Sequence, residues 1–419
     1  MESESPFYYS PYMDPDSYAE TVFGKPMRRA GDRWAFWFYA PNPLPRTLEL
    51  SEATILALST ADSSLGHLHG LGQLIRNPQL LVGPYSTREA LASSRIEGTN
   101  TSLANVMQAE AAEGAAAVDA DVEEVKRYLR ASETGYRLLA TLPLTQRLIR
   151  QAHRELVSGV RGAEKLPGEI RTSPVWIGSP TDSPDSATYV PPLPEYLPDL
   201  MIDWERFVNE PSRMPVLVRA ALMHYQFETI HPFLDGNGRI GRLLVGLMLV
   251  QERRLTTPLL YMSGYLEAHR NTYYSLLQGV RERGEIQEWI QFFLTAIARS
   301  ADDAVHRAGL VVRLREEYLQ DAARSRSMIA GLVDLIFTNP YLTVRRVQNH
   351  LGITNQGARN LIKDAQARGW VGDPQAIGRG GQLYWVAATV LDILEKPFSY
   401  ADADAETGPV ARTVTDAWS

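Results

Sequence analysis

The 419-residue chain contains no cysteine, which excludes disulfide bonds, thiolate catalysis and cysteine-based zinc sites. It has no apolar run of the roughly 18 residues that a membrane-spanning helix needs, and its first residues, MESE, are acidic, unlike a signal peptide. Basic charge is not in excess, because 49 acidic and 42 basic residues give a net charge of −7. This balance argues against nucleic-acid binding over the whole surface and leaves only a local basic patch open. We therefore expect a cytoplasmic protein without a membrane segment.

The composition, with 44% hydrophobic and 22% charged residues, is that of an ordinary globular protein, and the length predicts two or three domains. Residues 1–30 mix Tyr, Pro, Ser and Asp without a period, which predicts an irregular N-terminal arm. The aromatic run at 34–39 predicts a short buried strand or an aromatic plug. The rest divides into a helical N-terminal region at 31–121, a helical core at 122–310 and a second domain at 322–396. The acidic tail at 397–419 is expected to be disordered.

The most informative stretch is residues 229–242, which read TIHPFLDGNGRIGR. The apolar residues before it have helical spacing, and Pro232 predicts the end of that helix because proline disfavours helix in the preceding residue. The DGNG segment at 235–238 is typical of a tight turn, and the helical period resumes from Ile240. Residues 236–239 should therefore lie at a helix N-terminus, where free backbone N–H groups and the helix dipole favour an anion.

Charged side chains in the same stretch extend this anion site. Arg239 and Arg242 are three residues apart, hence on neighbouring positions of one helix face, which suits a polyphosphate better than a single phosphate. Asp235 supplies a hard oxygen ligand suited to Mg²⁺, and His231 is a base whose ordinary pKa is near neutrality. Each residue alone has a structural alternative, as a helix-end histidine, a solvated arginine or a turn residue. The ordered set favours the functional interpretation.

A second candidate element covers residues 86–100. Ser86 with Glu89 three residues later forms a capping-box pattern that predicts a helix start, and Gly98 is well placed to end the helix as a left-handed cap. Ser93 and Glu97 are one turn apart and share a face of this helix. Taken alone, Glu97 would be a solvated surface carboxylate.

Two short β-prone runs, at 174–178 and 187–191, flank the polar segment 179–186 and predict a hairpin. The hairpin either fills a surface gap between helices or forms a functional flap. Further on, the sequence predicts a helix-turn-helix with a wing. Helical runs lie at 329–336, 342–352 and 355–368, short strands at 370–371 and 383–386, and a glycine-rich turn at 377–381. Basic residues of this domain that we expect to be exposed could contact DNA phosphates, namely Arg345, Arg346, Arg359, Lys363 and Arg379. Asp364 and Asp373 dilute that face, and such domains also bind proteins, so DNA binding stays open.

Residues 231–242 resemble the Fic family signature, HPFxDGNGRxxR, at every fixed position, and residues 93–98, SSRIEG, are similar to the inhibitory motif (S/T)xxxE(G/N) of Fic proteins. The resemblance implies a mainly α fold with a Fic-type helical core and a β-hairpin flap. It also implies an N-terminal inhibitory helix at about 86–98 and a C-terminal winged helix-turn-helix domain. The activity implied is that of a self-inhibited protein adenylyltransferase, which transfers AMP from ATP to a Ser, Thr or Tyr hydroxyl of a protein and releases pyrophosphate.

The family pattern also implies a role for each matching residue. His231 would be the general base, Asp235 would hold Mg²⁺ and Phe233 would anchor the loop. Adenine and ribose would lie near Asn271 and Tyr274. The phosphates would contact the backbone N–H groups at the helix N-terminus and the two arginines, and the residues concerned are Gly236, Asn237, Gly238, Arg239 and Arg242. The inhibitory motif comprises Ser93, Glu97 and Gly98, with Glu97 paired to Arg242 in the γ-phosphate position.

The resemblance implies ATP as substrate and a protein target docked on the flap at 174–191 as an added strand. Self-modification, a homodimer, and nucleotides such as UTP or CDP-choline stay open. Two alternatives also remain. One is a winged-helix transcription regulator that only senses a nucleotide, and the other is a bifunctional enzyme in which Glu97 positions a water that removes AMP from the modified protein.

Overall fold

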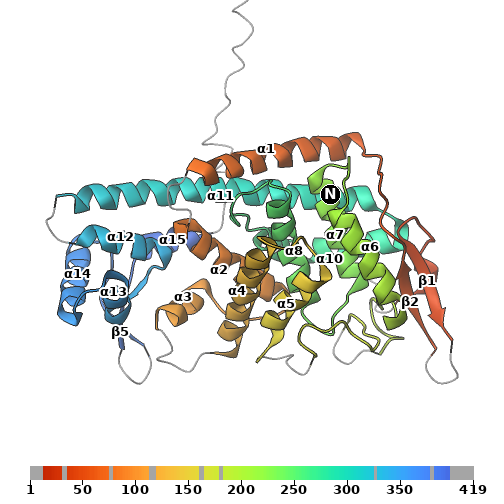
Figure 1. Cartoon of the computed structure of the whole chain (residues 1–419), viewed down its shortest axis with the longest axis horizontal. Helices are drawn as coiled ribbons and strands as arrows, with labels where there is room; N and C mark the ends of the chain where they lie inside the picture. The colour runs from red at the N-terminus through yellow and green to blue at the C-terminus, as the bar shows by residue number, and fades with distance from the viewer. Residues whose placement is uncertain are drawn as a thin grey trace, which may run out of the picture.

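A computed structural model describes residues 13–30, 35–74, 79–112, 119–159, 165–178, 183–324, 328–377 and 382–396. The prediction of a mainly helical protein is confirmed, since the described residues form long helices and two small antiparallel sheets. Helices α1 (Glu52–Leu74) and α11 (Ile286–Ala322) lie side by side along the long axis of the molecule (Figure 1). No helix in the described part of the chain is both long and apolar enough to cross a membrane.

The core is built around helix α7 (Val216–Ile230), whose residues from Leu217 to Ile230 are all buried. Two tryptophans hold its backbone, because Trp204 donates to the Met223 carbonyl at 3.1 Å and Trp289 donates to the Ala221 carbonyl at 2.9 Å. Helix α7 packs against α6 (Leu197–Asn209), α8 (Asn237–Gln251), α11 and α1. The other helices of the core are α4 (Ala120–Leu139), α5 (Gln146–Val157), α9 (Ser263–Ala268) and α10 (Arg270–Arg283). Burial on every side makes α7 a rigid support for the loop that follows it.

The helix that carries Ser93 begins earlier than predicted, and it ends at Ile96, so Glu97 is the first residue after it. It is α2 (Gln79–Ile96), so the predicted start at Ser86 is wrong, and α3 (Leu103–Ala111) follows it. The Glu89 carboxylate does not cap the helix, because it accepts hydrogen bonds from Ser263 instead. The C-terminal part of the prediction is confirmed, since Gly98 has a φ of +100° two residues after the last residue of the helix.

The N-terminal arm is more regular than predicted. Strand β1 (Gly24–Arg29) pairs with β2 (Phe36–Pro41) in antiparallel register, and a short 3₁₀ turn (Pro15–Ser17) precedes it. The aromatic run at 34–39 does contribute a strand, from Phe36 onward. The polar sequence of β1 carries no strand signal of its own, and it becomes a strand because β2 offers unpaired backbone groups. Residues 1–12 lie outside the described residues.

The predicted hairpin at 174–191 is reduced to one antiparallel bridge. Ile177 and Tyr189 exchange backbone hydrogen bonds of 2.8 and 3.1 Å, and no longer strand forms among the described residues of this segment. Prolines at both ends, including Pro191, lack the N–H that a ladder needs. The Tyr189 hydroxyl donates to the Thr229 carbonyl at 2.7 Å, so the bridge is tied to the end of α7. Residues 179–182 lie outside the described residues.

The three helices predicted for the C-terminal part of the chain are present, but a strand that was not predicted, at Tyr341–Thr343, occupies the start of the second one. The C-terminal elements are α12 (Ile329–Thr338), β3 (Tyr341–Thr343), α13 (Val344–Leu351), α14 (Asn355–Ala367), β4 (Gln375–Ile377), β5 (Gln382–Val386) and α15 (Ala388–Glu395). The strands form one antiparallel sheet in the order β3-β5-β4, and the predicted strand at 370–371 is replaced by β4. The turn at 378–381, with Arg379, and the tail at 397–419 lie outside the described residues.

Helix α11 spans residues 311–321, which lie between the helical core and the C-terminal domain predicted from the sequence. It runs without interruption for 37 residues and packs against both α1 and α12. Tyr318, near its end, stacks on Trp370 with ring centroids 4.7 Å apart. Asn339 donates to the Met107 carbonyl of α3 at 2.9 Å, so the C-terminal domain also contacts the N-terminal region. Arg346 was predicted to be exposed, but it is partly buried and donates to the carbonyls of Asn339 and Tyr341.

Candidate active site

The loop between α7 and α8 is held in one shape by hydrogen bonds within it. His231 ends α7 in the left-handed region with a φ of 51°, and its backbone N–H donates to the Phe227 carbonyl at 2.9 Å. The Asn237 side chain bonds both backbone groups of Phe233, each at 2.8 Å. The Phe233 ring is buried and stacks on His153 at 3.8 Å. The loop is therefore preorganised, and Phe233 lies where an anchor is expected.

Backbone geometry after the loop gives α8 an N-terminus whose N–H groups suit an anion. Gly236 caps the helix with a φ of +77°, and an added Cβ would press on Leu156. The first N–H groups of α8 have no partners within the helix, as at any helix N-terminus. The Asp235 Oδ1 accepts from the Gly236 N–H at 2.6 Å and lies 3.3 Å from Arg239. Asp235 is the one carboxylate of this loop, and its side chain is 40% exposed.

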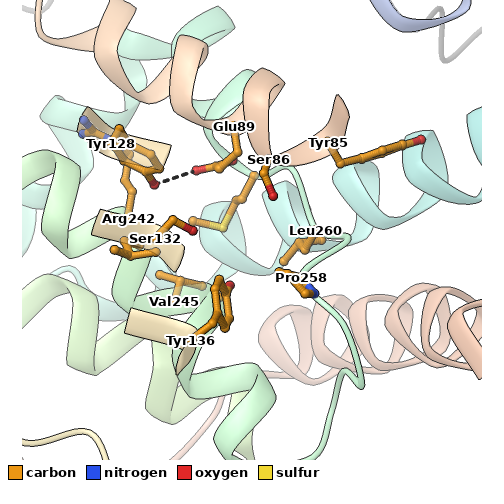
Figure 2. Close-up of a pocket in the computed structure, with 13 residues that line it drawn as sticks. Tyr85, Ser86, Glu89, Tyr128, Ser132, Tyr136, Arg242, Val245, Pro258 and Leu260 are labelled. Carbon is orange, nitrogen blue, oxygen red and sulfur yellow. Dashed lines mark hydrogen bonds between the residues drawn. The ribbon is translucent and has the colours of Figure 1, made fainter. Parts of the chain in front are cut away.

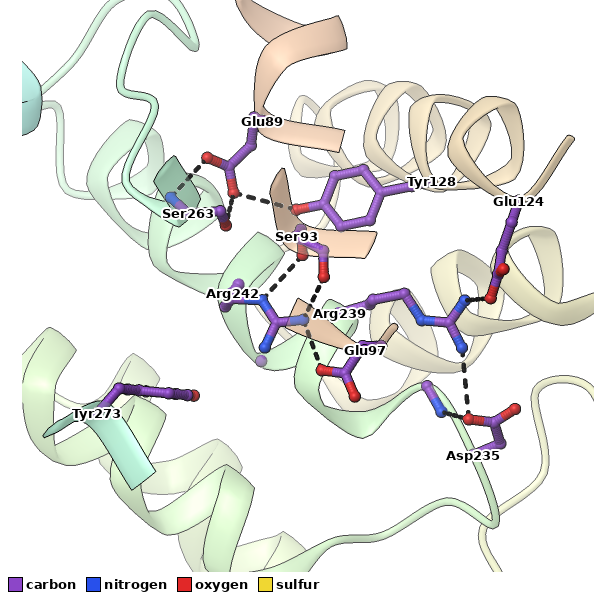
Figure 3. A network of polar contacts seen from close by, with 12 residues as sticks. Glu89, Ser93, Glu97, Glu124, Tyr128, Asp235, Arg239, Arg242, Ser263 and Tyr273 are labelled. Atoms are coloured by element: carbon purple, nitrogen blue, oxygen red, sulfur yellow. Dashed lines mark hydrogen bonds and ion pairs between the residues drawn. The ribbon is translucent and has the colours of Figure 1, made fainter. Parts of the chain in front are cut away.

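The two arginines of α8 are buried and carry carboxylate partners. Arg239 pairs with Glu124 of α4 at 2.8 Å, in addition to Asp235. Arg242 pairs with Glu97 at 2.7 Å, and it also donates to the Ser93 hydroxyl at 2.9 Å and the Ser93 carbonyl at 2.8 Å (Figure 3). The structure thus brings Ser93, Glu97 and Arg242 together although 145 positions separate Glu97 from Arg242.

Glu97 covers the anion site. An added Cβ on Gly238 would overlap its carboxylate, so Glu97 lies directly on the first turn of α8. Burial alone would raise the pKa of Glu97, but the guanidinium groups of Arg242 and Arg239 outweigh it and hold the pKa below its usual range. Burial likewise opposes the charge of Arg242, yet Glu97 raises its pKa above the usual value. Both groups are therefore ionised at neutral pH, and the pair lies on the first turn of α8.

His231 is kept neutral by its surroundings. Burial lowers its pKa to about 3, and the nearby positive charge of Arg171 acts in the same direction. The Nδ1 atom lies 3.4 Å from the Glu228 carbonyl, so a proton on Nδ1 would leave Nε2 as the acceptor. An unprotonated imidazole beside an anion site can accept a proton from an incoming hydroxyl.

Arg171 supports the loop and was not among the predicted site residues. Its guanidinium donates to the His231 carbonyl at 2.7 Å, and to further carbonyls of Ser173, Pro192 and Ile230. Its own backbone N–H donates to the Pro232 carbonyl at 2.9 Å. The sequence offered only the segment GEIR before the flap, without a sign of these contacts.

His153 is a core residue of α5. It is fully buried, its Nε2 lies 2.9 Å from the Asp235 carbonyl, and its Nδ1 accepts from the Gly168 N–H. Burial lowers its pKa to about 4, so it stays neutral. It positions the loop through Phe233 and the backbone of Asp235.

Helix α10 carries the two residues expected near adenine and ribose. Asn271 is exposed on the first turn of this helix. Tyr274 is partly exposed, its ring lies 5.1 Å from that of Tyr273, and burial raises its pKa to about 12, with the charge of Glu97 acting in the same direction. Tyr274 therefore borders the charged site, whereas no contact places Asn271 there among the described residues.

A small hollow is lined by residues of α2, α4 and α8, among them Glu89, Tyr128 and Arg242 (Figure 2). It is bordered by Glu89, whose Oε2 accepts from the Ser263 N–H at 2.9 Å and whose Oε1 accepts from the Ser263 hydroxyl. Tyr128 of α4 lies 3.5 Å from the same carboxylate. Burial raises the pKa of Glu89. Glu89 thus anchors α2 to α9 and α4, and it sets where Ser93 and Glu97 lie.

Comparison with known proteins agrees with this geometry. Residues 143–249 match the Fic/DOC family, and residues 55–137 match the Fic/DOC family N-terminal region. The protein adenylyltransferase Fic of Drosophila yakuba is 32% identical over 178 residues, and that of Aedes aegypti is 33% identical over 162 residues. These alignments cover 42% and 38% of this chain, and the chain spans 31% and 29% of the length of those relatives.

A solved structure supports the fold. A Fic family protein from Desulfovibrio desulfuricans superposes with a TM-score of 0.52 and 20% identity, over 82% of this chain and 98% of that chain. His231 and the N-terminus of α8 therefore lie in the helical part of the chain that matches the Fic/DOC family, and the fold matches that of a solved Fic family protein. The chain carries a Fic domain preceded by the N-terminal region of the Fic/DOC family.

Proposed function

We propose that this chain is a self-inhibited protein adenylyltransferase that transfers AMP from ATP to a hydroxyl of a protein. The observation that carries the proposal is the Glu97–Arg242 pair on the first turn of α8, beside the neutral imidazole of His231. The names of the matched relatives support this activity and do not favour the transcription-regulator alternative.

In the reaction, His231 accepts the proton of a Ser, Thr or Tyr hydroxyl of the target. The hydroxyl oxygen attacks the α-phosphorus, and the bond from that phosphorus to the bridging oxygen of the β-phosphate breaks in line. The backbone N–H groups at the start of α8 hold the phosphates. Arg239 and Arg242 stabilise the charge on the departing pyrophosphate once Glu97 has left Arg242.

The donor set fits Mg²⁺ bound together with a nucleotide. Both hydrogen bonds to Asp235 end on Oδ1, and the exposed side chain leaves Oδ2 accessible to a cation. No cluster of three or more metal-ligating side chains occurs among the described residues, which suits an ion that takes its other ligands from phosphates and water. Bound there, Mg²⁺ would neutralise phosphate charge, and Asp235 would be its protein ligand.

The segment at 174–191 is the proposed docking site for the target. Trp176 and Ile177 are large apolar side chains with exposed fractions of 42% and 38%, and they lie at the bridge that is tied to α7 through Tyr189. An extended target segment could pair with the backbone beyond this bridge and bring a hydroxyl to His231. DNA contact by the exposed Arg345, Arg359 and Lys363 stays a prediction, as do self-modification and a homodimer.

The test is transfer of label from α-labelled ATP with Mg²⁺ in a matched cell lysate. We expect labelled protein with the Glu97→Gly variant, weak labelling with the wild type, and none with Glu97→Gly combined with His231→Ala. Label on the γ-phosphate should not transfer. Absence of transfer from every variant, with ATP bound, would favour a nucleotide sensor.

A further inference from the structure

Glu124 of α4 is a carboxylate that the proposed reaction does not use. Its two oxygens contact different parts of the site, because Oε1 lies 2.8 Å from Arg239 Nη1 and Oε2 accepts from the Thr99 hydroxyl at 3.1 Å. The Glu124 side chain is only 13% exposed, and Arg239 lies between Glu124 and Asp235 (Figure 3). One carboxylate thus joins an arginine of the anion site to Thr99, which lies two residues after Glu97.

The segment after α2 determines where the Glu97 carboxylate lies, because the helix ends one residue before Glu97. This segment is fixed to α4 at two points. Thr99 bonds Glu124 through its side chain, and the backbone N–H of Asn100 donates to Asp121 Oδ2 at 2.9 Å. Both acceptors lie in the first two turns of α4, so the start of that helix sets the path of the chain beside the inhibitory residue.

Glu97 needs such support because its own contacts are few. Its side chain is 34% exposed, and among the described residues the one hydrogen bond to its carboxylate comes from Arg242 at 2.7 Å. Solvent can compete for a carboxylate of this exposure, so the pair persists only while the backbone holds Glu97 above α8. We propose that Thr99 and Glu124 form a second latch of the self-inhibited state, in which their bond holds the segment that carries Glu97 over the anion site. The inference rests on the proposed function, since it assigns supporting residues to the inhibition by Glu97.

The strength of the bond suits this role. A hydrogen bond to a charged group is stronger than one between neutral groups, and its loss shifts an equilibrium by about tenfold to a hundredfold. The bond from Asn100 to Asp121 remains when the Thr99 bond is lost, so only part of this factor should reach Glu97. Among the described residues the Thr99 hydroxyl bonds only Glu124, so Thr99 acts through Glu97 and is a positioning residue.

A second threonine of the same segment provides a matched control. Thr101 is 7% exposed, close to the 8% of Thr99, but its hydroxyl has no hydrogen-bond partner in the part of the chain that the structure describes. Replacing either threonine with valine removes a hydroxyl at nearly constant volume. A change that acts through packing should therefore appear at both positions, and loss of the latch should appear at Thr99 alone.

The test measures auto-labelling with α-labelled ATP and Mg²⁺ in two backgrounds, wild type and Glu97→Gly. In the wild type we expect Thr99→Val to raise labelling about threefold to tenfold, since one of the two anchors is lost. Thr99→Ser should stay near the wild type because it keeps the hydroxyl, and Thr101→Val should change nothing. In Glu97→Gly, Thr99→Val should change labelling by less than about twofold, because no carboxylate is left to hold. Unchanged labelling with Thr99→Val, the same factor in both backgrounds, or equal activation by Thr101→Val would overturn the inference.

Hydrogen exchange separates this inference from the proposed function, because it needs no activity. Thr99→Val should speed exchange of the backbone amides at 97–100 relative to the wild type and to Thr101→Val. Glu124→Ala, with its fold checked by circular dichroism, should do the same, and adding Thr99→Val to it should change little because both remove one bond. Unchanged exchange with Thr99→Val would overturn the latch. Absence of labelling from Glu97→Gly, together with faster exchange in Thr99→Val, would refute the proposed function and leave the anchor in place.

Discussion

Replacing Glu97 with glycine should convert a poorly active chain into an active one. The change removes the carboxylate that lies on Gly238 and holds Arg242, and it touches no group that the reaction uses. Arg242 should keep its orientation, because its bonds to the hydroxyl and carbonyl of Ser93 remain. The γ-phosphate could then take the place of the carboxylate.

The magnitude follows from how deeply the pair is buried. The Arg242 side chain is 1% exposed and that of Glu97 is 34% exposed, so the pair lies between a surface ion pair and a fully buried one. Breaking a buried pair changes the free energy by about 3–5 kcal/mol, and an exposed pair contributes about 0–1 kcal/mol. We take about 2–3 kcal/mol for this half-screened case, which corresponds to an activation of roughly 30-fold to 150-fold.

The assay is auto-labelling with α-labelled ATP and Mg²⁺ under identical conditions for both proteins. Glu133→Gly serves as the control, because Glu133 is exposed on α4 and shows no ion pair within the described residues. Arg242→Ala should not activate, since it removes the group that the phosphate needs. Equal labelling of wild type and Glu97→Gly, or more from the wild type, would refute the inhibitory role of Glu97.

Four further changes test other parts of the site. His231→Ala should lower transfer by roughly 10²–10⁴-fold with ATP affinity nearly unchanged; a parallel loss of affinity in calorimetry would make the residue structural. Asp235→Ala should remove the Mg²⁺ dependence of ATP binding, and an unchanged Mg²⁺ titration would contradict its role. Glu89→Ala should release α2 from Ser263 and raise auto-labelling several-fold, whereas a lower melting temperature with unchanged labelling would separate the anchor from inhibition. Burial raises the pKa of Glu228 in the folded state to about 7, against an ordinary value of 4.5, so the folded state binds the proton more tightly than the unfolded state. The wild type should therefore lose about 3 kcal/mol of unfolding free energy relative to Glu228→Gln as pH rises from about 4.5 to 7. Equal pH dependence of the unfolding free energy in the two proteins across that range would refute the shift.

Local chemistry made the centre of this site predictable from the sequence. The end of α7 at Pro232, the turn at 235–238 and the start of α8 depend on residues adjacent in the chain, and so does the left-handed cap at Gly98. Periodic apolar residues likewise indicated the helical core and the three helices α12, α13 and α14. Each of these features is encoded within a few residues of where it occurs.

The supports of the site were decided only by tertiary structure. Arg171 bonds carbonyls up to 60 positions away, and Glu89 bonds Ser263 across 174 positions. Glu124 holds Arg239 from another helix, and β1 is a strand only because β2 lies beside it. An arginine or glutamate shows the same local pattern whether it is solvated or buried against distant carbonyls and hydroxyls. Its partner is chosen by how the helices pack, so the capping-box interpretation of Glu89 failed while the turn around His231 was predicted correctly.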